Sequence, residues 1–466
     1  MRLKTLFLLL TVSSFQFLFA QDFEKDSIFI RQIYDESLVN GESYENLRYL
    51  CKAIGHRLSG SEEAEEAVLW GKKVLDKMGL DRVELQAIEV PFWERGDVEK
   101  AYIQDIVPVE LEISALGGSI GTNGVMGTRV IEVSSLDQLD SIGKDKIEGH
   151  FVFYNRPMDP RNISTFKSYG GCVDQRYWGA VKAAEFGAVG VFVRSMTLLE
   201  NDEHPHTGSM AYKDGVTKIP AVALSTRSAN LLHRYLQDQE TINLQLELDC
   251  KMNPDKSSFN VIGEIKGSAY PDEIMVVGGH LDSWDIGEGA HDDGAGIVHS
   301  MEVLRILKAL NYQPLHTVRV VLFMNEENGN MGGKSYARIA KRKNENHVLA
   351  LESDRGGFVP RGFSVAGSEE QLELMRSVDE LLKPYDLHFF EKGFGGVDIS
   401  PLHDSANLVN PQLMMMGLVP DSQRYFDHHH SGTDVFENVN KRELELGCAA
   451  MTAAIYLMDN RLLKGN

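Results

Sequence analysis

Histidines and carboxylates, the residue types that bind zinc in proteins, gather in four short segments of the second half of the chain. These segments are residues 280–293, 326–327, 352–354 and 428–430. One histidine beside an acid is usually a hydrogen-bonded structural group. Four such segments indicate a cation, because burying several carboxylates together is costly unless positive charge neutralises them. The pattern therefore predicts a zinc centre that keeps a position open for a catalytic water.

Two pairs of near neighbours give hypotheses about individual roles. Asp282 follows His280 by two residues, and it is placed to accept the second ring N–H and fix the histidine tautomer. Glu326 and Glu327 are adjacent, so their side chains cannot point the same way from an extended backbone. One of them can bind metal while the other faces the bound water. A solvated acidic patch is the alternative, which the neighbouring Gly-rich loops and buried strands disfavour.

Alternating strand and helix patterns place these segments at strand ends. The expected strands are 274–279, 317–323, 347–353 and 413–416, and the expected helices are 296–310, 334–340, 370–382 and 441–459. Such alternation predicts an α/β fold in which helices flank a mixed, mostly parallel sheet. Ligands bind at the carboxyl ends of the strands in such sheets. The metal-binding residue types follow the strands directly, as this rule requires.

The middle of the chain has a different character. Between Phe92 and Cys250, short β-rich runs such as 150–154 and 188–193 are separated by Gly and Pro. We therefore predict an inserted β-rich domain at 116–254, and a catalytic domain built from 21–115 and 255–466.

Composition limits the possible partners and compartments. The chain has 466 residues, 43% of them hydrophobic, and can bury a large core. Its formal net charge of −21 argues against nucleic acid and anionic lipid as partners, because both attract positive charge. The four cysteines form no CxxC pair, so free buried thiols are a simpler interpretation than a zinc ribbon or disulfide framework.

The first residues predict an export signal. Arg2 and Lys4 precede an apolar stretch, and Ala20 is followed by Gln21. We expect cleavage after Ala20, which would give a secreted or periplasmic protein with no membrane span in the mature chain. A membrane anchor is the alternative, but the apolar run is short and is interrupted by polar residues.

Four motifs together are specific to one group of enzymes. They are GGHLDSWDIGEGAHDDGAG at 278–296, NEENG at 325–329, ESD at 352–354 and YFDHHHSGTD at 425–434. The sequence resembles the co-catalytic zinc aminopeptidase and carboxypeptidase family, and within it the carboxypeptidase Q branch. Segments 55–61, 115–123, 204–208 and 219–225 also resemble that branch, so the similarity covers nearly the whole mature chain.

The resemblance implies a function and a mode of assembly. The expected enzyme is a zinc-dependent exopeptidase that hydrolyses short peptides, above all dipeptides with free termini, by means of a metal-activated water. The inserted segment resembles a protease-associated domain, and a homodimer is possible.

The resemblance also implies a role for each matching residue. The ligands of two zinc ions would be His280, Asp292, Glu327, Asp354 and His430. Asp292 would bridge both ions, and a cis peptide bond would join it to Asp293. Glu326 would be the general base that takes a proton from the metal-bridging water.

One ligand and one neighbouring residue leave choices open. The family ligand stands directly before Ser or Thr, with an Asp four residues on, which favours His430 and keeps His429 in reserve. Arg355 follows Asp354 where relatives commonly have a small residue. It could alter the substrate pocket, although an outward salt bridge is the simpler interpretation.

Three other functions compete with this one. They are an aminopeptidase acting on longer peptides, an acyltransferase of the glutaminyl cyclase type that works with one zinc, and a catalytically inactive binding homologue. The intact set of predicted ligands disfavours the last two.

Overall fold

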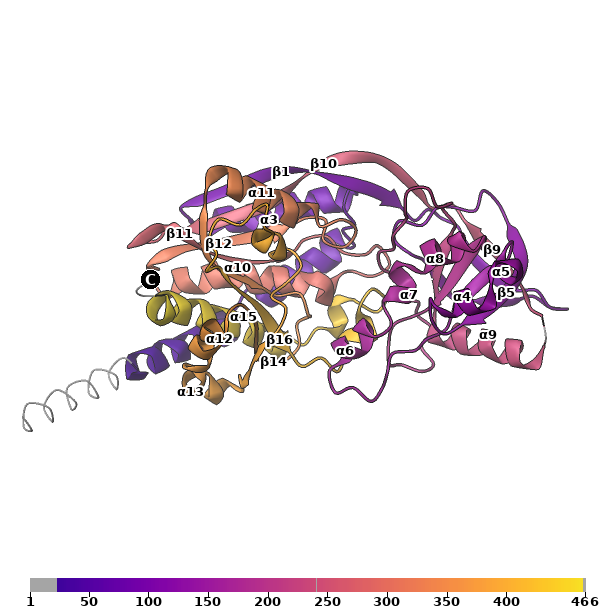
Figure 1. Cartoon of the computed structure of the whole chain (residues 1–466). Coiled ribbons are helices and arrows are strands. Elements are labelled where there is room, and N and C mark those ends of the chain that lie inside the picture. The colour runs from indigo at the N-terminus through magenta and orange to yellow at the C-terminus, as the bar shows by residue number, and fades with distance from the viewer. Residues whose placement is uncertain (1–22, 240, 464–466) are drawn as a thin grey trace, which may run out of the picture.

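The computed structural model describes residues 23–239 and 241–463, and it contains two eight-stranded sheets at opposite ends of an elongated molecule (Figure 1). The predicted signal segment, residues 1–20, lies outside the described residues. None of the helices within the described ranges has the length and hydropathy needed to cross a membrane. All four cysteines are free and buried, as predicted.

The first sheet carries the metal-binding segments and has the strand order β1-β10-β12-β11-β13-β16-β14-β15. Its strands are β1 (Arg82–Glu94), β10 (Lys251–Ile265), β11 (Tyr270–His280), β12 (His316–Phe323), β13 (Asn346–Glu352), β14 (Pro360–Ala366), β15 (Phe389–Lys392) and β16 (Met414–Pro420). Strand β11 pairs in parallel with β12 and β13, and β13 pairs in parallel with β16. The pairs β1–β10, β10–β12 and β14–β16 are antiparallel. The predicted mixed, mostly parallel sheet is confirmed.

Helices cover both faces of this sheet because its strands are apolar on both sides. Along β12, Val320 packs in a core with α3, α10 and α15, whereas Val321 packs with α11 on the opposite face. The helices of this part are α2 (Ser43–Tyr49), α3 (Glu62–Lys77), α10 (Ala295–Ala309), α11 (Met331–Lys343), α12 (Glu369–Arg376), α13 (Asp379–Leu382), α14 (Tyr425–His428) and α15 (Lys441–Leu457). Residues 23–40 are also helical.

The helix expected at 370–382 is divided into α12 and α13. Val378, between them, has a non-helical backbone (φ −107°, ψ 8°), and the Ser377 hydroxyl donates to the Leu374 carbonyl. Such a side-chain bond to the backbone competes with continuation of the helix. The sequence patterns also did not identify β14 and β15 at the edge of the sheet.

The second sheet is formed by the middle of the chain in the order β3-β2-β9-β5-β6-β7-β8-β4. Its strands are β2 (Glu99–Ile103), β3 (Val109–Leu111), β4 (Ile113–Ala115), β5 (Met126–Val133), β6 (Phe151–Tyr154), β7 (Gly190–Arg194), β8 (Ala221–Leu224) and β9 (Asn243–Leu248). Its helices are α4 (Gln138–Ile142), α5 (Lys144–Ile147), α6 (Thr165–Gly170), α7 (Asp174–Tyr177), α8 (Gly179–Glu185) and α9 (Thr226–Asp238). Three strands precede residue 116, and the division of the chain into two domains stays a prediction.

A long two-stranded ribbon joins the two sheets. Strands β1 and β10 pair antiparallel from Arg82 opposite Glu264 to Glu94 opposite Lys251, and they run along one side of the molecule (Figure 1). The chain therefore leaves the first sheet and returns to it through strands that are paired with each other.

Candidate metal centre

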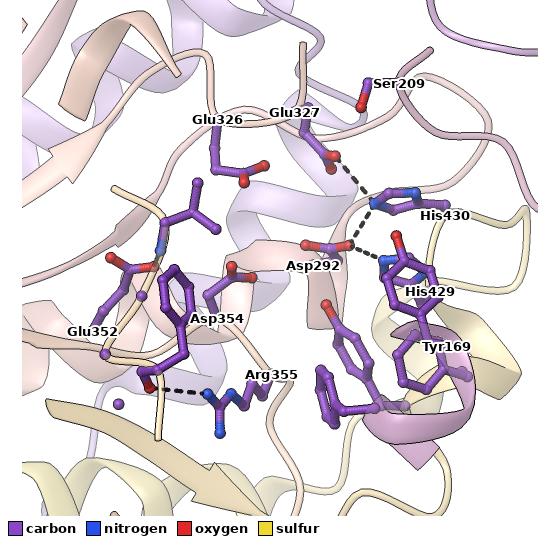
Figure 2. A pocket seen from close by; sticks show the side chains of 18 of the residues that line it. Tyr169, Ser209, Asp292, Glu326, Glu327, Glu352, Asp354, Arg355, His429 and His430 are labelled. Atoms are coloured by element: carbon purple, nitrogen blue, oxygen red, sulfur yellow. Dashed lines mark hydrogen bonds and ion pairs between the residues drawn. The ribbon is translucent and has the colours of Figure 1, made fainter. Parts of the chain in front are cut away.

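The carboxyl ends of β11, β12 and β13 meet at a cavity of about 350 Å³. His280 is the last residue of β11, and Glu326, Glu327 and Asp354 follow β12 and β13 within four residues. Five of the predicted site residues line the cavity, namely Asp292, Glu326, Glu327, Asp354 and His430 (Figure 2). His280 and Asp282 are buried beside them. The structure thus brings together the residues that the sequence assigned to one site.

Asp292 lies between two groups of potential metal ligands. Its Oδ1 is 3.2 Å from His280 Nε2, which is 3.5 Å from Asp354 Oδ1. Its Oδ2 is 3.2 Å from His430 Nε2, which is also 3.2 Å from Glu327 Oε2. Each oxygen of one carboxylate therefore faces a separate set of nitrogen and oxygen donors. This is the arrangement that a bridging ligand requires.

Two consecutive histidines approach Asp292 from the same loop. His430 Nε2 contacts both Asp292 and Glu327, whereas His429 Nε2 is 3.7 Å from Asp292 alone. The rings of the two histidines stack with centroids 3.5 Å apart. The geometry favours His430 as the ligand, although His429, Asp292 and His430 also lie close enough together to hold an ion.

The donor set fits a divalent metal. Among the described residues, Glu327 Oε1 is buried without a hydrogen-bond partner, and such an atom is costly unless a cation or water satisfies it. Burial raises the pKa of Glu327 to about 7 and raises that of Glu326 as well. Burial opposes the charged form of His430, but the neighbouring Glu327 and Asp292 carboxylates raise its pKa to about 9. A divalent cation at this position would oppose these shifts by stabilising the charged carboxylates.

Asp282 positions the two glutamates, which differs from the role expected for it. His280 Nδ1 contacts the Asp282 backbone carbonyl at 3.0 Å, whereas the Asp282 carboxylate is 3.8 Å away. That carboxylate instead accepts the backbone N–H groups of residues 325, 326 and 327, at 2.7, 3.0 and 3.2 Å. The residue still fixes the histidine tautomer, but through its backbone, because its side chain binds the turn after β12.

The turn that carries Asp292 is held by two further carboxylates. Asp434 accepts the backbone N–H groups of His291 and Asp292, at 2.7 and 3.1 Å. Asp293 accepts the backbone N–H groups of His280 and Gly296, each at 3.0 Å. The peptide bond between Asp292 and Asp293 is cis, as the family resemblance implied. Neither supporting role was predicted, although Asp434 stood out by its spacing from His430.

The segment at 55–61 supports the loop that follows β11. Arg57 is fully buried and donates to the carbonyls of Leu281, Glu288 and Gly289, at 2.8, 2.6 and 2.9 Å. These contacts satisfy a buried cation with backbone oxygens. A motif with no chemistry of its own thus fixes the path of the chain between His280 and Asp292.

Residues 204–208, from the second-sheet part of the chain, hold the loop that carries His430. The Thr207 N–H donates to the His430 carbonyl at 2.8 Å, and His430 Nδ1 is 3.3 Å from the Thr207 carbonyl. His206 Nδ1 contacts the His429 carbonyl at 2.7 Å, and its Nε2 is 3.3 Å from Asp202 Oδ2. A proton on His430 Nδ1 leaves Nε2 to bind metal.

Replacement of His206 by alanine is expected to weaken metal binding more than folding. The loop around His429 would lose a buried hydrogen bond, and loss of such a supporting contact typically lowers metal affinity by roughly 10–100-fold. Titration of the metal-free protein with buffered zinc measures this change. His233→Ala is the matched control, because His233 pairs with Glu132 on the surface, away from the cavity. Equal zinc affinity in both variants would contradict the supporting role of His206.

Comparison with known proteins identifies the family to which the chain is similar. Residues 260–455 match Peptidase family M28. Carboxypeptidase Q of Xenopus laevis is 37% identical over 424 residues, and that of Homo sapiens is 34% identical over 418 residues. In both cases the match covers 89% of this chain and 85% of the relative.

Two solved peptidase structures have a fold similar to that of this chain. A peptidase M28 precursor from Shewanella amazonensis superposes with a TM-score of 0.88 at 32% identity, covering 94% of this chain and 97% of that one. A zinc aminopeptidase from Bacillus subtilis superposes with a TM-score of 0.63 at 18% identity, covering 91% of this chain and 96% of that one. The second likeness concerns the fold alone.

Proposed function

This chain belongs to peptidase family M28, and we propose that it hydrolyses dipeptides with free termini at a centre of two zinc ions. Its general class, independent of the exact substrate, is that of a metallo-exopeptidase that acts on peptides. The observation that carries the proposal is Asp292, whose two carboxylate oxygens face two separate sets of ligands.

The proposed ligand sets follow from these contacts. His280, Asp354 and Asp292 would hold one zinc ion, and Glu327, His430 and Asp292 would hold the other. Imidazole nitrogen and carboxylate oxygen are ordinary zinc ligands. A one-zinc acyltransferase would not need the second set, so two zinc ions per chain would exclude it.

In the proposed mechanism, Glu326 transfers the proton. Zinc, when bound, supplies Lewis acidity and lowers the pKa of a coordinated water. The Glu326 carboxylate lines the cavity and is not among the proposed ligands, so it is free to accept a proton from the attacking water. It then delivers that proton to the nitrogen of the leaving amine. The Asp282 carboxylate keeps Glu326 in place through the backbone N–H of that residue.

The size of the cavity supports a short substrate. Its volume of about 350 Å³ is at the low end for small-molecule sites. Aromatic side chains from both parts of the chain line it, namely Phe166, Tyr169, Tyr425 and Phe426. An extended dipeptide spans only about 7 Å, which fits a site of these dimensions.

Export and assembly complete the proposal. An export signal that ends at Ala20 would deliver the mature enzyme to the periplasm or the exterior. A homodimer and a protease-associated character of the inserted segment remain predictions from the family resemblance.

The activity can be tested with a panel of free dipeptides and their end-blocked derivatives. The mature chain is expected to release amino acids only from dipeptides with both ends free, and chelation of zinc is expected to abolish this release. Amino-acid analysis with and without added zinc measures both effects. Cleavage of carboxyl-blocked peptides would instead indicate an aminopeptidase, and no cleavage by zinc-loaded protein would indicate an inactive binding homologue.

A further inference from the structure

Building on the proposed peptidase function, we propose that Arg355 binds the free carboxylate of the substrate and thereby selects peptides with a free carboxyl end. Arg355 directly follows the proposed ligand Asp354, on the loop after β13, and it lines the cavity. Figure 2 shows its guanidinium at the opposite end of the cavity from Glu327 and His430. It is therefore a specificity-determining residue placed beyond the proposed metal site.

The Arg355 guanidinium has unused hydrogen-bonding capacity. One nitrogen donates to the Phe394 carbonyl at 3.2 Å, and the group lies 5.5 Å from the centroid of the Phe166 ring. Among the described residues, no carboxylate forms an ion pair with it, so the outward salt bridge expected from the sequence is not found. A guanidinium carries five N–H donors in a planar fork, and most of these remain free.

Arg355 is partly buried, and the two carboxylates that precede it on the same loop, Asp354 and Glu352, are engaged elsewhere. Asp354 faces His280, while Glu352 accepts the backbone N–H groups of Val397 and Ile399. A guanidinium in such surroundings gains most from a carboxylate that it can bind in bidentate fashion. The free end of a peptide supplies that carboxylate.

The other arginine of the cavity, Arg176, makes more contacts than Arg355, although its Nε has no hydrogen-bond partner among the described residues. Arg176 donates to the Tyr169 hydroxyl at 2.8 Å and to the Thr207 carbonyl at 3.4 Å, next to His430. Most of the remaining charge around the cavity is negative and would repel a substrate carboxylate, namely Glu326, Glu352 and Asp354. In a dipeptide the carboxylate lies one residue beyond the scissile bond, so its receptor must share the cavity with the catalytic groups. Arg355 meets this requirement.

Kinetics of Arg355→Gln and Arg355→Lys test the proposal, with Arg361→Gln as the matched control. Arg361 pairs with Asp386 and Asp421 and does not line the cavity. With alanyl-leucine, Arg355→Gln is expected to lower kcat/KM by about 10–100-fold, mainly through KM, and Arg355→Lys to restore part of the loss. Alanyl-leucine amide, which lacks the free carboxylate, is expected to inhibit this hydrolysis with inhibition constants that differ by less than about threefold between the variant and the wild type. An equal loss of affinity for both compounds, or no loss for either, overturns the proposal.

A binding measurement separates this proposal from the proposed function. Calorimetry with the zinc-loaded Glu326→Gln protein compares alanyl-leucine with its amide in the absence of turnover. Preference for the free acid is expected, and adding Arg355→Gln is expected to abolish it. If the wild type hydrolyses no dipeptide but this preference exists and depends on Arg355, the proposed function fails and the role of Arg355 stands. If acid and amide bind equally to Glu326→Gln, the role of Arg355 is refuted whatever the activity.

Discussion

Replacement of Asp292 by alanine is expected to remove both zinc ions and to lower kcat/KM by about 10³-fold or more. Both proposed sites lose a ligand at once, because the two carboxylate oxygens face different ligand sets. Without the bridging carboxylate the cations are no longer held between the two ligand sets. The remaining carboxylates then repel each other. Elemental analysis of the purified protein gives the zinc-to-chain ratio, and dipeptide hydrolysis gives the activity.

A surface aspartate provides the control for this loss. Asp386→Ala removes a carboxylate that pairs with Arg361 on the exterior, and it is expected to retain the zinc and the activity of the wild type. A variant at Asp292 that kept two zinc ions per chain would show that this residue does not bridge them. Retention of one zinc would assign the residue to a single site.

Glu326→Gln is expected to keep both zinc ions while kcat falls by about 10²–10⁴-fold, the range found for loss of a general acid–base group. Glutamine preserves the size of the side chain but cannot accept the proton of the attacking water. The adjacent Glu327→Gln variant is the contrasting case, because Glu327 contacts His430 as a proposed ligand. That variant is expected to lose one zinc ion as well as its activity.

The pair of variants distinguishes a base from a ligand within two neighbouring residues. Metal analysis and steady-state kinetics on the same preparations are sufficient for this purpose. Full turnover by Glu326→Gln would remove Glu326 from the mechanism. Loss of zinc from that variant would instead make Glu326 a ligand and require a different proton acceptor.

Much of the site could be predicted from the sequence because ligands in α/β folds bind at the carboxyl ends of the strands. Strands β11, β12 and β13 each contain an apolar run in the half that leads to the carboxyl end, so their ends could be located and the residues after them assigned to one edge. This is why His280, Glu326, Glu327 and Asp354 were expected together. The edge strand β15 was not identified because it is short and only partly buried.

The remaining features depend on contacts between distant segments. His430 has a left-handed backbone conformation, with φ of 58°, and periodicity along a sequence cannot predict which of three consecutive histidines turns inward. The use of the Asp282 side chain by the turn at 325–327 likewise joins residues that lie more than 40 positions apart. The unpaired state of Arg355 is also a property of its surroundings, so the sequence left two interpretations open.

The contact between Thr207 and His430 ties the loop of a proposed metal ligand to the second-sheet part of the chain. The ribbon of β1 and β10 joins the two parts through a two-stranded arm, and further contacts, those of residues 204–208 and of Phe166 with Tyr425 among them, attach the second part near the metal centre. A displacement of the second sheet would therefore disturb the loop that carries this proposed ligand.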